Sequence, residues 1–146
     1  MKIRTELINF SNEMTLDSGE KLESFELMIE TYGELNKSGS NAILLCHAFS
    51  GDHHAAGVNH ESKIGWWDEV VGPNKAIDTD KYYVVCCNNL GGCAGSSGPT
   101  TINPSTNKPY GKNFPQVSVR DWVNSQKILM DRLDIPYWHL VAGGSL

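Results

Sequence analysis

Four short segments of the chain are rich in apolar residues and carry few charges. They cover residues 25–32, 41–47, 81–88 and 138–142. The first alternates partly between apolar and polar positions, whereas the second and third have continuous apolar centres. Continuous apolar runs of this length are typical of strands buried on both faces of a parallel sheet. The pattern therefore predicts four strands, with the inner ones in a parallel arrangement.

A helix is predicted between the last two of these strands. The side chains that recur at helical spacing are Trp122, Gln126, Leu129, Met130 and Leu133. Ser118 is a natural N-cap, Asp121 completes a start resembling a capping box, and Pro136 is expected to mark the stop. The order strand, helix, strand over residues 82–142 predicts a crossover unit with parallel strands and the helix packed on the sheet.

The segment between the third strand and this helix, residues 89–117, is dense in Gly, Pro, Ser, Thr and Asn. A loop of this length in a small domain is usually functional or disordered. Its glycines at 91, 92 and 95 would let the backbone approach another surface closely. A plain surface excursion agrees equally well with the composition.

The charge balance changes the range of partners to be considered. Twelve basic and seventeen acidic residues give a net charge of −5, which argues against a nucleic-acid or anionic-membrane surface. No apolar run approaches the roughly 20 residues that span a bilayer, and residues 1–6 turn polar too early for a signal peptide. A cytoplasmic location, with no membrane or nucleic-acid partner, is therefore expected.

The cysteines agree with that location. Cys46, Cys86 and Cys87 lie inside apolar runs, where cysteine behaves as a small buried hydrophobe, and no C-x-x-C spacing occurs. Cys86 and Cys87 are adjacent, so on a strand they should point to opposite faces of the sheet.

The fourth strand runs into Gly143-Gly144-Ser145-Leu146. These residues fill the first places of G-x-S-x-G, the nucleophile elbow, in which a serine sits on a tight turn after a strand. Ser145 is therefore a candidate nucleophile. Taken alone, the pattern favours an ordinary glycine-serine turn.

The segment 46–54, CHAFSGDHH, directly follows the second strand. In α/β-hydrolases a loop after an early strand lends one backbone N–H to the oxyanion hole, and the residue after the nucleophile lends the other. These positions here are the backbones of Phe49 and Leu146. Two such donors can lower the barrier by a few kcal/mol.

A metal site is the alternative for the same region. The candidate ligands are His47, Asp52, His53, His54 and His60. Their spacing matches no metal signature, so no metal is expected, and His53, His54 and His60 are interpreted as solvated loop residues. The pair Trp66-Trp67 could form a ligand wall, but packing against the body of the domain is the favoured interpretation.

Taken together, these segments resemble the homoserine O-acyltransferases of the α/β-hydrolase fold, typified by the O-acetyltransferases. The resemblance is carried by the stretches 46–57, 65–99, 100–135 and 139–146. At Phe49 the family more often has Leu, which changes a side chain and not the backbone N–H. The resemblance implies an α/β fold of the α/β-hydrolase type, with residues 1–146 as the N-terminal part of a single domain that ends at the nucleophile elbow.

The resemblance also implies an activity. Ser145 would accept an acetyl group from acetyl-CoA and pass it to the hydroxyl of L-homoserine, with the Phe49 and Leu146 amides as oxyanion hole, in methionine biosynthesis. No permanently bound cofactor is implied, and a complete family member is expected to be a homodimer. The alternatives are a succinyl donor, a related esterase that uses water as acceptor, and a non-catalytic fragment or half of a split enzyme.

The chain departs from the family in one respect that yields a prediction. The triad order in this fold is serine, acid, histidine, yet all five histidines precede Ser145. The triad acid and base, the later strands and the cap are absent from residues 1–146. We therefore expect low stability and negligible transferase activity from this polypeptide alone. Thiol release from acetyl-CoA in the presence of homoserine measures the activity. Turnover at an ordinary enzymatic rate, or a cooperative melt at ordinary mesophile temperatures, would contradict these expectations.

Overall fold

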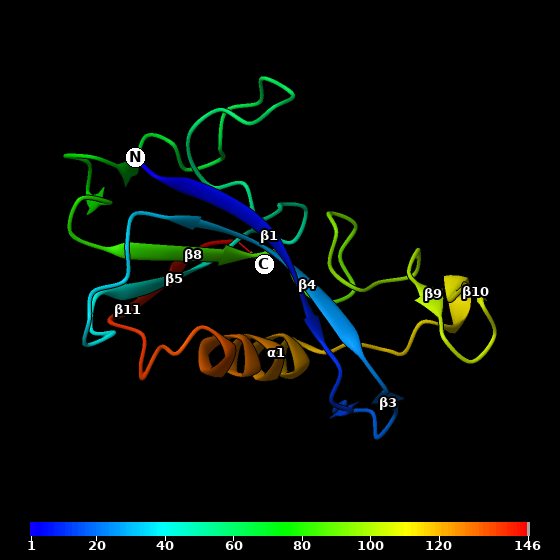
Figure 1. The fold of residues 1–146 in the computed structure, drawn as a ribbon. Coiled ribbons are helices and arrows are strands. Elements are labelled where there is room, and N and C mark those ends of the chain that lie inside the picture. The colour runs from blue at the N-terminus through cyan, green and yellow to red at the C-terminus, as the bar shows by residue number, and fades with distance from the viewer. Residues whose placement is uncertain (146) are drawn as a thin grey trace.

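A five-stranded sheet forms the centre of the computed structural model, which describes residues 1–145 (Figure 1). Its strands, in spatial order, are β1 (Ile3–Phe10), β4 (Phe25–Tyr32), β8 (Tyr83–Cys87), β5 (Ala42–Cys46) and β11 (Leu140–Gly143). The four strands expected from the apolar runs are all present, with small shifts at their ends.

The sheet is mixed. β5 pairs in parallel with both β8 and β11, whereas β4 pairs antiparallel with β8 and with β1. The predicted crossover from β8 through the helix to β11 exists, and β5 lies between its two strands. The parallel part of the expected α/β architecture is therefore confirmed for β8, β5 and β11.

β1 was not predicted from the sequence. Its sequence, IRTELINF, has no long apolar run, and only Ile8 and Phe10 of the strand are buried. Short paired segments also escaped prediction: β2 (Met14–Thr15), β3 (Lys21–Leu22), β6 (Val71–Gly72), β7 (Ile77–Asp78), β9 (Ile102–Asn103) and β10 (Lys108–Pro109). Segments of two residues are too short to carry a periodic pattern.

The predicted helix is α1 (Val119–Arg132), and a short 3-10 helix, η1 (Gly111–Asn113), precedes it. Ser118 is the N-cap, and the reciprocal bonds with Asp121 form a complete capping box, as expected. The predicted stop at Pro136 is wrong, because the helix ends at Arg132 and Asp134 already adopts a left-handed φ of 55°. Pro136 instead packs where Gly39 has no side chain.

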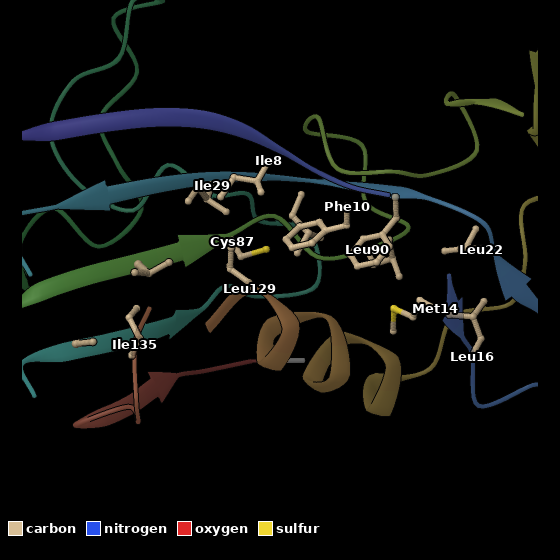
Figure 2. Close-up of a cluster of buried hydrophobic side chains, with 14 residues drawn as sticks. Ile8, Phe10, Met14, Leu16, Leu22, Ile29, Cys87, Leu90, Leu129 and Ile135 are labelled. Atoms are coloured by element: carbon tan, nitrogen blue, oxygen red, sulfur yellow. The ribbon is translucent and has the colours of Figure 1, made fainter. Parts of the chain in front are cut away.

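α1 covers one face of the sheet (Figure 1). Strand alternation directs Val85 and Cys87 of β8 to this face, where Leu129 of the helix packs beneath Cys87 (Figure 2). Other buried members of this core include Ile8, Phe10, Phe25, Leu27, Ile29, Leu90 and Ile135. The phenyl rings of Phe10 and Phe25 stack with their centroids 4.7 Å apart.

The opposite face is covered by the segment between β5 and β8. Cys86 lies in this second core, so the prediction that Cys86 and Cys87 point to opposite faces is confirmed. Its remaining buried members are Tyr32, Ile43, Leu45, Ala55, Ala56, Val71, Ile77 and Val84.

β11 has β5 as its single partner within residues 1–145. Leu140 and Val141 are accordingly 44% and 56% exposed. No helix in this part of the chain is both long and apolar enough to cross a membrane.

The packing of α1 yields a prediction about stability. Leu129 is fully buried between the helix and the sheet, so Leu129→Ala should lower the free energy of unfolding by about 3 kcal/mol. Val123 is 58% exposed on the same helix, so the control Val123→Ala should change it by less than about 0.5 kcal/mol. Urea denaturation of both variants measures the difference. Equal effects would contradict the assigned packing.

Candidate active site

The segments that follow the three parallel strands meet at one edge of the sheet. Parallel strands present their carboxyl ends on the same side, which is where open α/β sheets bind ligands. Residues 47–51 follow β5, residues 88–93 follow β8, and Gly144 and Ser145 follow β11. The candidate site consists of these three segments.

His47 joins the first two of them. Its Nε2 atom accepts a hydrogen bond of 3.1 Å from the backbone N–H of Asn89. Because Nε2 is an acceptor, the ring proton is on Nδ1, which donates to the carbonyl of Ala48 at 2.7 Å. Gly51 N–H donates to the same carbonyl at 2.8 Å and closes the turn. His47 is thus a buried structural bridge with both ring nitrogens occupied.

Phe49 lies at the top of this turn, and its side chain is 77% exposed. It borders a cleft of about 570 Å³ whose other walls come from the segment after β8 and from the start of α1. The lining includes His47, Gly51, Asn89, Gly92, Phe114 and Trp122. The Phe49 side chain therefore faces open space instead of the core.

The turn after β11 has the backbone geometry of a tight elbow. Ser145 adopts a φ of 65°, in the left-handed region that residues other than glycine rarely occupy. A Cβ atom on Gly143 would clash with the backbone of Cys46, whereas one on Gly144 would meet nothing. The glycine at 143 is therefore required by the close approach of β11 to β5.

Ser145 and the β5 turn share a second hollow of about 400 Å³. It is lined by Cys46, His47, Val141, Ala142, Gly143, Gly144 and Ser145. His47 borders both this hollow and the cleft at Phe49. Leu146 lies outside the described residues, and the roles of Ser145, Phe49 and Leu146 stay predictions.

The long loop 89–117 is tied to the sheet. Ser96 and Ser97 are buried, and their hydroxyls accept hydrogen bonds from the backbone N–H groups of Met28 and Glu26 on β4 at 3.0 and 2.8 Å. Asn88 Oδ1 accepts from the N–H groups of Ala94 and Ser96. These side chains hold the loop beside β4 where β8 has ended, so it forms a wall of the cleft.

Comparisons with known proteins agree with this geometry. The chain is 58% identical to the homoserine O-succinyltransferase of Hahella chejuensis over 146 residues, covering 99% of this chain and 38% of the relative. Among solved structures, homoserine O-acetyltransferase from Bacillus anthracis shares 37% identity with a TM-score of 0.91, covering 99% of this chain and 40% of that one. This chain matches the N-terminal portion of the homoserine O-acyltransferase family.

Esterase E22 is a further neighbour, with 39% identity, a TM-score of 0.90 and coverage of 99% of this chain and 41% of that one. No family model matches the chain. The neighbours have the α/β-hydrolase fold, so the fold class and the resemblance expected from the sequence are confirmed. The chain spans about 38% of the length of the first relative.

The histidines after the β5 turn differ from expectation. The interpretation of His54 as a solvated loop residue is wrong, because it is 7% exposed and pairs with Glu30 at 2.7 Å. His53 is half-buried, and burial lowers its pKa, although the charge of Asp52 opposes this. His60 is exposed. No group of three or more potential metal ligands occurs among residues 1–145.

The two adjacent tryptophans, Trp66 and Trp67, lie in different environments. Trp67 packs against the second core, in agreement with the favoured interpretation. Trp66 remains 36% exposed and donates its Nε1 hydrogen to the carbonyl of Asp52 at 3.0 Å. It thereby ties residue 52 to the segment 64–67.

Sequence reasoning missed Glu30 as a partner of His54. Both are buried, yet they lie far apart in the sequence. The one available signal was a carboxylate inside the strand FELMIETY, two positions before Tyr32 and hence on the same face.

The state of His54 yields a pH prediction. Burial lowers its pKa, but the hydrogen bonds to Glu30 and to the carbonyl of Lys63, with the charge of Glu30, outweigh this and raise the pKa above 6.5. A raised pKa stabilises the fold fully below about pH 6.5, and this contribution is lost as the pH rises through the higher value. The stability difference between wild type and His54→Gln should therefore be largest below about pH 6.5 and shrink as the pH rises above that value.

Chemical denaturation across that pH range measures the difference. His60→Gln, at an exposed histidine of the same loop, is the matched control and should give a small difference at every pH. A difference for His54→Gln that grows with pH would contradict the charged pair.

Proposed function

We propose that this chain is the part of a homoserine O-acyltransferase that supplies the nucleophile, Ser145, and that the acyl donor is succinyl-CoA. The observation that carries the proposal is the left-handed backbone of Ser145 directly after β11, beside the turn that contains Phe49. The match to a homoserine O-succinyltransferase at 58% identity favours succinyl over the acetyl group expected from the sequence.

The reaction would proceed in two transfers. Ser145 Oγ attacks the thioester carbonyl, its proton passes to a base, and the carbon–sulfur bond breaks to release CoA as the thiol. The hydroxyl of homoserine then attacks the acyl-serine ester, which gives O-succinyl-homoserine and restores the serine. The N–H groups of Phe49 and Leu146 would hold the oxyanion in both steps. Methionine biosynthesis remains the predicted use of the product.

Three of the five histidines, His47, His54 and His139, do not fit the role of the base. His47 and His54 have both ring nitrogens engaged. His139 precedes β11 and so lies at the end of the strand opposite to Ser145. We therefore assign the base and its acid to a region equivalent to the part of the relatives that this chain does not span.

Ester hydrolysis is a second candidate function. It is favoured by the similarity to esterase E22, which has 39% identity over nearly the whole chain. The same acyl-serine would then be resolved by water instead of homoserine.

A chimera tests these proposals: residues 1–146 of this chain followed by the part of the Hahella chejuensis relative beyond the alignment. We expect homoserine-dependent thiol release from succinyl-CoA, faster than from acetyl-CoA. Ser145→Ala should lower it by about 10³-fold or more, and the matched control Ser105→Ala, in the exposed stretch before β10, should leave it unchanged.

Each outcome separates the candidates. Mass spectrometry should find one succinyl group on Ser145 when homoserine is omitted. Ester hydrolysis or thiol release that is independent of homoserine would favour the esterase. Full activity in Ser145→Ala would overturn the assignment of the nucleophile, and a preference for acetyl-CoA would overturn that of the donor.

A further inference from the structure

Glu30 of β4 is a buried carboxylate on the sheet face opposite to α1. It is 3% exposed, and it accepts a hydrogen bond of 2.8 Å from the hydroxyl of Thr5 on β1. Its other oxygen meets the hydroxyl of Tyr32, also on β4, and the ring of His54 from the segment that follows the β5 turn. A buried carboxylate costs several kcal/mol unless it is paired and hydrogen-bonded, so these contacts offset the cost of burying Glu30.

The two partners of His54 define its charge. Nδ1 lies 2.7 Å from a carboxylate oxygen of Glu30, and Nε2 lies 3.0 Å from the carbonyl oxygen of Lys63. The carbonyl of Lys63 can only accept, so Nε2 donates to it, and an ionised Glu30 accepts from Nδ1. With Glu30 ionised, His54 is an imidazolium that forms a buried charge pair with it.

Tyr32 extends this pair to the backbone. Its hydroxyl oxygen accepts hydrogen bonds from the N–H groups of Ala55 and Ala56 at 2.7 and 3.0 Å. Since two donors already point at this oxygen, the hydroxyl proton is directed to Glu30. Burial, followed by the hydrogen bond to Glu30, raises the pKa of Tyr32, so the hydroxyl keeps its proton.

These contacts fix residues 52–56, which directly follow the turn that contains Phe49. Asp52 Oδ1 accepts from the N–H of His54 at 2.8 Å, and Gly51 N–H closes the turn onto Ala48. His47 anchors the other end of the turn to Asn89, in the segment after β8. The Phe49 amide therefore lies on a turn that is clamped at both ends by buried side chains.

We propose that Glu30 and His54, together with Tyr32, are positioning residues that hold the turn 48–51 in the geometry that the acyl transfer requires. This inference rests on the proposed function for its catalytic consequence. The structural coupling from β4 to the turn can be measured without any activity.

The structural test uses NMR on the chimera, with residues 1–146 carrying the ¹⁵N label. In Glu30→Gln and in Tyr32→Phe we expect hydrogen exchange at Gly51, Ala55 and Ala56 to accelerate by about 10-fold or more, with a shifted Phe49 amide resonance. The control Thr5→Val removes a contact to Glu30 from the β1 side only and should leave the turn unchanged.

The ¹⁵N chemical shifts of the His54 ring add a measurement that a general loosening of the packing would not change. Its ring nitrogens should show the imidazolium state in wild type and lose it in Glu30→Gln. Tyr32→Phe keeps the charge pair and nearly the same volume, so it decides the matter where Glu30→Gln fails to fold. Unchanged exchange and an unchanged Phe49 resonance in folded Tyr32→Phe would overturn the proposal.

The catalytic test uses the chimera. Tyr32→Phe should lower kcat by about 10-fold or more while the KM for the acyl-CoA stays nearly constant, because the turn acts on the transition state. A wild-type kcat would overturn the positioning role. An inactive chimera whose NMR response is intact would overturn the proposed function, while the coupling from β4 to the turn would stand.

Discussion

The imidazole of His47 connects the ends of β5 and β8, and the candidate site lies around this connection. One ring nitrogen accepts from the Asn89 N–H and the other donates to the Ala48 carbonyl. A side chain that bridges these two groups needs one acceptor and one donor on opposite sides of a rigid ring, which neutral histidine provides. This residue links the turn after β5 to the cleft wall after β8, and it also borders the hollow at Ser145.

The site is formed mainly by backbone that is brought close together. The absence of a side chain at Gly143 lets β11 end against Cys46, and Ser145 then turns out of the strand with a left-handed φ. Ser96 and Ser97 tie the loop 89–117 to β4 with their hydroxyls. Within residues 1–145 the site thus offers the exposed hydroxyl of Ser145, whereas the imidazole of His47 near it has both ring nitrogens engaged.

On the opposite face of the sheet, the charge pair of Glu30 and His54 also holds a loop segment against β4. A buried ion pair adds little net stability, because desolvation offsets the attraction, but it tolerates few alternative arrangements. Each oxygen and nitrogen here has a defined partner: Thr5, Tyr32 and the carbonyl of Lys63. These contacts consequently fix the backbone of the segment 52–56 over β4, and this restrains the position of the turn 48–51 that precedes it.

The sequence by itself determined the elements whose patterns are local. Apolar runs located β4, β5, β8 and β11, the spacing from Ser118 to Leu133 located α1, and alternation separated Cys86 from Cys87. Tertiary structure alone decided what depends on partners distant in the chain. β1 is defined by pairing with β4 and has little apolar pattern of its own, and Asp134 ended the helix before Pro136 through its backbone conformation. His54 could not be separated from a solvated loop histidine until the fold placed Glu30 of β4 against it. The physical reason is that hydrophobic periodicity reports which face of an element is buried, whereas the pairing of polar groups depends on which elements the fold brings into contact.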